Sequence, residues 1–389
     1  MDEGQGRPAP VEFTGARPEL FGLLFRGYLL MLPTLGIYRF WVTTWKRRFY
    51  WQNTVIDGDP LEYTGHAMQL LIGFLFALAF FLPIYILFFF LSTQSPEITI
   101  LGYAVVGLTL WFLSGYAIYR ARDFRLSRTL WRGIRFNQHG NAWGYALRRF
   151  GWSALMILTL GLAYPFMAAN LWKYRYNHTW YGDRQCRWEG SWKTIAGPFY
   201  ATYFVVVALV VAGLAAGLPL PVTGIAGATA GGLGWFYFRS REATRMFSRI
   251  RLGDAAIAVR VRARALLGQF LAYCLSLTGA LVVLAIFAAM IAGLFLGDIF
   301  LKGGAQSAEL AGLLQSGWGP VALLVLAYLS IIASFGLFGE VFLGCGYWML
   351  VARGATIANA DSLRSVRATG EDHALVGEGL ADALNVGAY

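Results

Sequence analysis

One short pattern recurs along this chain, and long apolar segments separate its copies. In the copy NTVIDGDPLEYTG, a short run reaches Gly58, and a second run of alternating residues ends at Gly65. Asp-Gly and Gly-Asp pairs supply the positive φ that a tight turn needs, so the pattern predicts a β-hairpin. Similar spacings occur in TLWRGIRFNQHG with Gly133 and Gly140, in NHTWYGDRQCRWEG with Gly182 and Gly190, and more faintly in SRIRLGDAAIAV, while Glu12 to Gly15 form a half-copy.

The composition is that of an integral membrane protein. Of the 389 residues, 57% are hydrophobic and 14% are charged, whereas a typical soluble domain carries about 25% charged residues. The net charge of +11 comes from basic residues in short loops beside apolar segments. We interpret these residues as signals of membrane topology and expect no nucleic-acid partner. The three cysteines are too few and too scattered for a disulfide framework or a zinc site.

Three pairs of apolar segments are long enough to cross the hydrocarbon core of a bilayer, which needs about 20 residues. The link inside the first pair, STQSPE, contains no Lys or Arg, but the loop after the pair, Arg120 to Arg149, contains eight basic residues. Cytoplasmic loops are enriched in Lys and Arg, so we predict that the hairpin loops lie in the cytoplasm and the links outside. The pairs are residues 67–91 with 98–118, 195–217 with 222–238, and 268–296 with 319–339.

Two shorter apolar segments share a motif. Thr34-Leu35-Gly36 returns 125 residues later as Thr159-Leu160-Gly161, and Gly58-Asp59 returns after 124 residues as Gly182-Asp183. Two motifs in the same order at nearly the same offset indicate an internal duplication. We therefore divide the chain into a first repeat unit at 1–120, a second at 121–240, a degenerate third at 241–352, and a polar tail at 353–389 that we expect to be poorly ordered.

The Thr-Leu-Gly segments are too short for two crossings, which need about 40 apolar residues. If all hairpins face one compartment, each segment is a re-entrant helical hairpin that turns at Leu-Gly. A Thr hydroxyl should then bond a freed carbonyl, the crossing helices should shelter each turn, and a pseudo-two-fold axis along the membrane normal should relate the two copies. The alternative is a single crossing for each segment, giving eight transmembrane helices with hairpins on alternating sides. Either way, the predicted fold is a mainly α polytopic helical bundle with small cytoplasmic β-hairpins.

The order of these motifs resembles the YjgN family of bacterial inner-membrane proteins, which is defined by a domain of unknown function. The match is strong over residues 10–195 and weak from Arg239 onward, where the chain has Ser276-Leu277-Thr278-Gly279 in place of an expected Thr-Leu-Gly-Leu stretch. The resemblance implies an inner membrane and a multi-pass bundle, and it implies no substrate. The residues that agree are Gly15, Thr34-Leu35-Gly36, Trp41, Gly58, Tyr63, Gly65, Arg128-Thr129, Trp131-Arg132-Gly133 and Thr159-Leu160-Gly161.

Residues that could perform chemistry are few. The four histidines show no metal-ligand spacing, and no nucleotide-binding or hydrolase motif is present, so we assign no catalytic, cofactor-binding or metal-binding residue. Arg26 and Glu340 are ionisable residues within apolar segments. Charge at membrane depth is expensive and often functional, so these two form a candidate intramembrane polar site. The alternative for both is that the side chain simply reaches the interface.

Three functions from different classes fit the sequence. The first is a membrane scaffold that binds lipid, including anionic phospholipid, or partner proteins through its basic loops. The alternative is a small-solute transporter or channel, because many transporters build a site from internal repeats with Gly- or Pro-broken segments. A membrane enzyme is the remote alternative, and we expect no enzymatic activity. A water-filled cavity lined by Arg26, Thr34, Thr159 and Glu340 would favour the transporter, and a dry, sealed bundle the scaffold.

Overall fold

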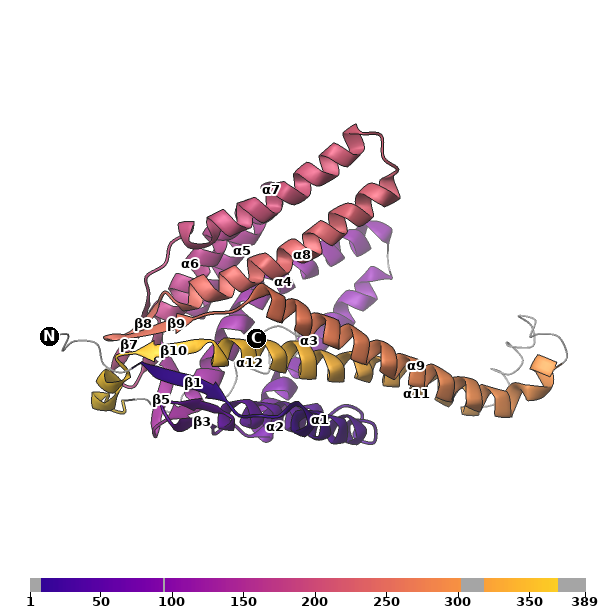
Figure 1. The fold of residues 1–389 in the computed structure, drawn as a ribbon. Coiled ribbons are helices and arrows are strands. Elements are labelled where there is room, and N and C mark those ends of the chain that lie inside the picture. The colour runs from indigo at the N-terminus through magenta and orange to yellow at the C-terminus, as the bar shows by residue number, and fades with distance from the viewer. Residues whose placement is uncertain (1–7, 94, 302–317, 370–389) are drawn as a thin grey trace.

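Ten short strands from along the whole chain close into one antiparallel barrel at the narrow end of the molecule (Figure 1). The computed structural model describes residues 8–93, 95–301 and 318–369. Each strand pairs with its neighbours in sequence, and the pair of β1 with β10 closes the ring. The strands are β1 (Ala9–Phe13), β2 (Thr54–Ile56), β3 (Asp59–Tyr63), β4 (Thr129–Trp131), β5 (Ile134–Gln138), β6 (Thr179–Tyr181), β7 (Arg184–Trp188), β8 (Ile250–Leu252), β9 (Ala255–Val259) and β10 (Ala355–Ala358).

The same succession of elements occurs five times around this barrel. A five-residue strand leads into a pair of helices, and the chain returns in a strand of three residues, or four in β10, that pairs with the first. The registers correspond, since Phe13 lies opposite Thr54, Tyr63 opposite Thr129, and Gln138 opposite Thr179. Tight turns then join one strand pair to the next.

The predicted turn glycines lie in those tight turns. Gly58 and Gly133 have φ of 84° and 71°, which confirms the positive φ expected there. The residues before them, Asp57 and Arg132, have φ of 51° and 53°, so both two-residue loops have the φ signs of a type I′ turn. In the next two turns the glycine is the first loop residue, and Gly182 and Gly253 have φ of 52° and 58°.

A second set of glycines lies two residues after four of the five-residue strands, β1, β3, β5 and β7. A Cβ on any of three of them would overlap the aromatic ring two residues earlier, so only glycine lets the ring lie flat on the backbone. Gly140, in the corresponding place after β5, has φ of 125° instead. The ring and glycine pairs are Phe13 with Gly15, Tyr63 with Gly65, and Trp188 with Gly190.

The prediction of a helical bundle with small separate hairpins is therefore wrong. The hairpins are recognisable because their turns are local, but the ladders between them join residues far apart in sequence, such as Phe13 and Thr54. Closure also needs β10, which lies in the tail that we expected to be poorly ordered. Residues 360–365 of that tail form the 3₁₀ helix η2 (Ala360–Ser365), and residues 370–389 lie outside the described part of the chain.

The helices fan out from the barrel as two short pairs and three long pairs (Figure 1). Among the described residues, five helical stretches are long and apolar enough to cross a membrane: 67–92, 99–127, 193–215, 263–291 and 321–353. The short pairs are α1 (Arg17–Met31) with α2 (Arg39–Gln52) and α5 (Ala142–Leu158) with α6 (Tyr164–Asn177). The long pairs are α3 (Ala67–Ser92) with α4 (Pro96–Ser127), α7 (Lys193–Ala215) with α8 (Leu220–Phe247), and α9 (Ala263–Leu301) with α11 (Trp318–Phe338), which continues through the π-helical η1 (Gly339–Gly344) into α12 (Cys345–Arg353).

The chain reverses direction at both Thr-Leu-Gly motifs, as the re-entrant interpretation requires. Leu35 and Gly36 have φ of 50° and 84°, and Leu160 and Gly161 have 50° and 90°. The hydroxyls of Thr34 and Thr159 donate to the carbonyls of Leu30 and Leu155, at 2.7 and 2.8 Å, which confirms the predicted threonine bond. Straight helices through these glycines are excluded, and so is the alternation of hairpin sides that depends on them, because all ten strands share one barrel.

Shelter of the two turns differs from the expectation. The side chains of Leu35 and Leu160 are 93% and 80% exposed, so the leucine at the tip of each turn points away from the protein. Only backbone of the second turn receives donors from a neighbouring long helix: Tyr203 and Tyr200 of α7 donate to the carbonyls of Leu160 and Leu162, at 3.0 Å each, in the bonds that the structure describes. A membrane depth and a pseudo-two-fold relation of the two turns stay predictions.

Candidate functional site

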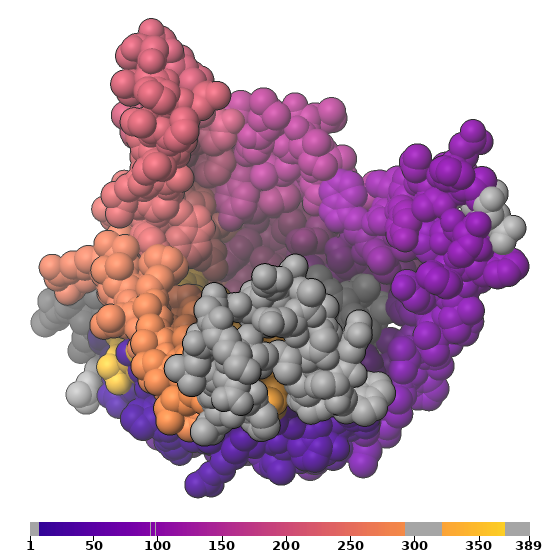
Figure 2. Space-filling view, turned by 90° about the vertical axis from the view of Figure 1, so that its right-hand side faces the viewer, coloured from indigo at the N-terminus to yellow at the C-terminus, as the bar shows by residue number. Residues whose placement is uncertain are grey.

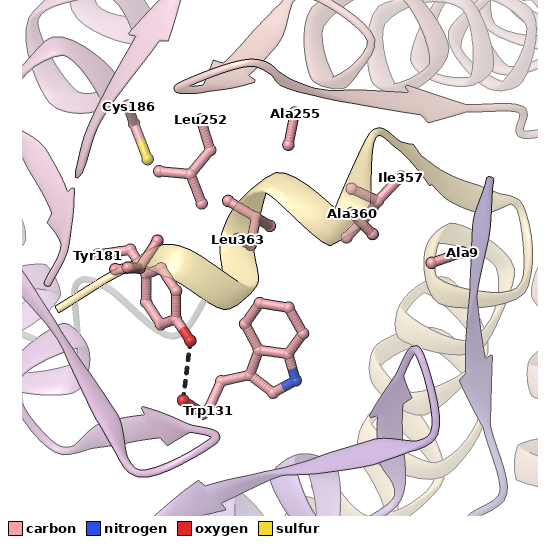
Figure 3. Packing of buried hydrophobic residues seen from close by; sticks show 10 residues of the cluster. Ala9, Trp131, Tyr181, Cys186, Leu252, Ala255, Ile357, Ala360 and Leu363 are labelled. Atoms are coloured by element: carbon pink, nitrogen blue, oxygen red, sulfur yellow. Dashed lines mark hydrogen bonds between the residues drawn. The ribbon is translucent and has the colours of Figure 1, made fainter. Parts of the chain in front are cut away.

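The interior of the barrel is packed with side chains. Trp131 and Tyr181 are fully buried there, and the Tyr181 hydroxyl donates to the carbonyl of Trp131 at 2.9 Å. The helix η2 enters one end of the barrel and places Leu363 among these residues (Figure 3). We call residues 360–366 the plug. A barrel filled in this way offers no open path along its axis.

Ionic contacts hold the plug against the tight turns. The Arg132 guanidinium binds Asp57 and Asp59, at 2.7 and 2.5 Å, and Arg364 of the plug lies 3.9 Å from the same Asp57. At the turn between β6 and β7, the backbone N–H of Asp183 donates to the carbonyl of Arg367, just after the plug, at 3.1 Å. The turns at Asp57 and Asp183 therefore both contact the plug or the residue that follows it.

Burial in the barrel changes the acidity of the groups inside it. Desolvation raises the pKa of the Cys186 thiol to about 12, and it also raises the pKa of Tyr181 to about 12. The nearby Arg122 opposes the shift of Cys186 in part. Both groups stay protonated at neutral pH, so Cys186 is an inert thiol in the folded protein.

We expect Cys186 to resist thiol reagents until the barrel unfolds. In a variant with Cys274→Ser and Cys345→Ser, maleimide at pH 7.5 should label the native protein negligibly and the SDS-denatured protein fully. Because the folded pKa lies above the ordinary value of 9.0, the stabilisation from the protonated thiol is complete below pH 9 and falls as pH rises toward 12. An added Ser365→Cys at the exposed end of η2 is the positive control. Equal labelling of Cys186 and that control in native protein would show an open barrel.

The second helices of the five pairs form a ring next to the barrel, and the long pairs diverge from it, as Figure 2 shows from the wide end. Each contacts the second helix of the neighbouring pair through large side chains. The contacts are Phe40 with Phe124 (α2, α4), Arg122 over Tyr176 (α4, α6), Trp172 with Phe247 (α6, α8), Arg239 over Tyr347 (α8, α12) and Trp348 with Tyr50 (α12, α2).

Three buried threonines fasten this ring to the barrel. Each begins a short strand, and its hydroxyl donates to the carbonyl four residues earlier, at 2.7 to 2.8 Å. Each hydroxyl also accepts a bond: Thr54 from Trp348 Nε1, Thr129 from Trp51 Nε1, and Thr179 from Arg122 Nη2. The sequence marks two of these threonines by their constant spacing from the turn glycine, but it does not show the bonds they make.

Glu340, one of the two predicted intramembrane charges, lies in the π-helical segment η1. Its carboxylate accepts bonds from Lys46 Nζ at 3.0 Å and from the Tyr50 hydroxyl at 2.6 Å, and its side chain is 13% exposed. Arg26 lies exposed on α1. The described contacts pair Glu340 with Lys46, not with Arg26, and Thr34 and Thr159 lie at the projecting tips. The residues suggested for one cavity are therefore spread over the molecule.

The sequence did not point to a second buried carboxylate, Glu242. Glu242 of α8 is 4% exposed, and it accepts bonds from Arg239 at 2.6 Å and from the Tyr164 hydroxyl at 2.5 Å. This arrangement of a carboxylate, a tyrosine and a cation matches that at Glu340, and each joins two neighbouring helices of the ring. The only sequence signal was an acidic residue within the basic run SREATR. Both carboxylates are paired, and their bonds to tyrosines connect neighbouring helices.

Removing Lys46 should destabilise the protein more than removing the pair. Lys46→Met leaves Glu340 partly buried without its cation, which should cost roughly 1–3 kcal/mol. The double variant Lys46→Met/Glu340→Gln removes that unpaired charge and should recover part of the loss. Thermal unfolding midpoints in one detergent measure both. A double variant that is as unstable as the sum of the single variants would show that the two side chains do not interact.

Among the described residues, no three His, Cys, Asp or Glu side chains gather as metal ligands would.

Comparison with known sequences assigns the chain to one family. The family described as a bacterial protein of unknown function, DUF898, matches residues 8–383, which confirms the resemblance to the YjgN family. No curated protein and no solved structure shows a significant match.

Proposed function

Because this chain belongs to DUF898, a family of bacterial proteins of unknown function, we propose its role from its structure: it is a membrane scaffold that binds anionic phospholipids and partner proteins. One observation carries this proposal. In the five membrane-length stretches, between 6% and 17% of the residues in the most apolar window are buried within the protein. Most residues in these windows are therefore at least partly exposed, and lipid or another protein must cover them.

The shape of the molecule supports a scaffold over a carrier. Many transporters enclose their site at the midplane between packed repeats. Here the three long helical pairs diverge from the barrel (Figure 1), and the barrel below them is filled by the plug. We propose no enzymatic reaction and no nucleic-acid partner for this arrangement.

We propose the bacterial inner membrane as the location, with the barrel on its cytoplasmic side. All ten strands share one barrel, so all the tight turns lie on one side of the protein, and the basic loops lie beside them. Cytoplasmic loops are enriched in Lys and Arg. Basic side chains at that surface would each contribute about 1 kcal/mol to the binding of anionic lipid.

Cysteine labelling of intact cells tests the orientation. In a cysteine-free background, single cysteines at Ser95 and Leu218, in the turns of two long helical pairs, should react with a membrane-impermeant thiol reagent. Cysteines at Arg187 and Asp254, exposed on the barrel, should react only after the membrane is permeabilised. Labelling of Arg187→Cys in intact cells would place the barrel outside and overturn the proposed orientation.

Lipid and metabolite profiling of the purified full-length protein, beside a deletion strain, tests the scaffold proposal. Phosphatidylglycerol and cardiolipin should be enriched on the protein relative to the bulk membrane, and no small metabolite should co-purify in stoichiometric amount. Bulk lipid composition together with a stoichiometric solute would overturn the scaffold and favour a transporter.

The transporter remains the second candidate because of Glu340. Its carboxylate lies in a π-helical segment and binds Lys46 and Tyr50, and π-helical segments and charges within apolar helices are both frequent at functional sites. Proteoliposomes loaded with a pH-sensitive dye test it. Under the scaffold proposal, wild type and Glu340→Gln give the same slow leak, whereas a proton-coupled carrier would lose flux in the variant.

A further inference from the structure

A pocket lies where α2 meets the start of the first membrane-length helix, α3. Its volume is about 280 Å³, and Trp41, Trp45 and Arg48 of α2 line one side. His66, Ala67 and Met68, at the beginning of α3, line the other. This pocket belongs to none of the polar clusters described above.

The groups in the pocket suit an anion. Arg48 Nη2 donates to the carbonyl of Gly65 at 3.2 Å and lies 3.5 Å from His66 Nδ1, which leaves other guanidinium donors for a ligand. The residues lining the pocket include no carboxylate. Ala67 and Met68 are the first residues of a 26-residue helix, where N–H groups lack intrahelical partners and the helix dipole favours negative charge.

The surroundings of the pocket suit a lipid. The helix that begins here is the most apolar of the five membrane-length stretches, so the pocket lies where a span leaves the barrel. Trp41 and Trp45 supply rings of the kind that gather at membrane interfaces, and Met68 is 54% exposed at the rim. A phospholipid whose phosphate is held by Arg48 and His66 would therefore place its acyl chains beside α3.

In the second half of the chain, an aromatic side chain fills the position equivalent to this pocket. Gly190 follows Gly65 by 125 residues, and the same offset pairs Trp192 with Ala67 and Phe166 with Trp41. The cap bonds agree, since Ser191 N–H donates to Thr194 as His66 N–H donates to Gln69. In the second half the Trp192 ring stacks on Phe166, with centroids 4.6 Å apart. The first half has alanine there and a pocket.

We propose that this pocket binds the phosphate headgroup of an anionic phospholipid. This inference rests on the proposed scaffold function and names the place where one lipid is held specifically. The phosphate lies between Arg48, His66 and the first turn of α3, and Trp41 and Trp45 pack against the glycerol backbone.

Binding of dihexanoyl phosphatidylglycerol, below its micellar concentration, to the full-length protein in nanodiscs of phosphatidylcholine tests the site. Arg48→Gln should weaken this binding about fivefold, which corresponds to the roughly 1 kcal/mol contributed by one basic side chain near a membrane. Ala67→Trp, which copies the second half of the chain, should block the pocket without changing charge. Arg184→Gln is the matched control, because it removes one positive charge from an exposed side chain at a tight turn of the barrel.

The outcomes separate the site from the general proposal. Equal affinity of Arg48→Gln, Ala67→Trp and wild type would overturn the pocket, even if all three prefer anionic nanodiscs. Wild type without any preference for phosphatidylglycerol over phosphatidylcholine would overturn the scaffold proposal itself. Inorganic phosphate that competes fully at an equal concentration would show a free-phosphate site instead of a lipid site. Photoactivatable phosphatidylglycerol should label the peptide that contains Ala67 and Met68, and labelling elsewhere alone would contradict the assignment.

Discussion

Replacing Leu363 by aspartate should prevent the protein from folding. Leu363 is 3% exposed, at the centre of the plug, and it packs beside Trp131 and Tyr181. A carboxylate at this position would lie among the apolar and aromatic side chains of the packed interior. Burying such a charge costs several kcal/mol, on the order of the whole stability of a typical domain. The yield of monodisperse protein after detergent extraction, measured by size-exclusion chromatography, should fall to near zero.

The control for this change lies two residues away. Ser365→Asp adds the same charge to the exposed end of the plug, and its yield should match wild type. Leu363→Met conserves side-chain volume and should cost less than about 1.5 kcal/mol. Normal yield and a normal melting midpoint for Leu363→Asp would mean that the plug leaves the barrel easily, and the barrel would then no longer count as sealed.

Gly182→Val should be the most damaging substitution at a tight turn. Its φ is 52°, where a β-branched residue is strained by about 1–3 kcal/mol. A Cβ would also overlap the carbonyl oxygen of Arg367, a backbone atom just after the plug, and approach Val366 Cγ1 to 2.8 Å. We therefore expect a drop in melting midpoint well beyond that caused by turn strain alone.

Gly58→Val separates these two causes. Gly58 has φ of 84°, but no atom beyond its two chain neighbours lies within 4 Å of a Cβ built on it. Its valine variant should carry the strain without the clash and keep most of its yield, and Gly133→Val should behave in the same way. Equal losses in Gly182→Val and Gly58→Val would show that the contact between the turn and the plug contributes nothing.

Local features of this fold could be predicted from the sequence because a few residues determine them. Asp57-Gly58 and Arg132-Gly133 encode turns through their allowed φ, and the two Thr-Leu-Gly motifs encode chain reversal through a glycine and a hydroxyl. Membrane-length helices follow from unbroken apolar composition. None of these features depends on what the rest of the chain does.

The barrel could not be predicted because its closure is not local. A hairpin pattern is the same whether its outer edges face solvent or pair with another hairpin. The pairing of Val259 with Ala355, across a long helical pair, leaves no sequence trace that distinguishes the two cases.

The plug was not predicted for a similar reason, since Leu363 and Val366 lie in a stretch of mixed polarity that resembles a tail. Glu242 was missed because its cation and its tyrosine come from the facing turn of its own helix and from α6.

The pairing of β1 with β10 delays closure of the barrel until nearly the whole chain has been synthesised. β1 and β2 leave the ribosome early, but the edge of β1 has no partner until Ala358 has been made, about 300 residues later. At about 5–20 residues per second, that edge stays open for roughly 15 to 60 seconds. During this time the membrane-length helices are made while an unpaired strand edge, a template for aggregation, remains at the barrel. Closure of the ring therefore cannot precede the synthesis of β10, and a chain whose synthesis stops before β10 keeps an open barrel.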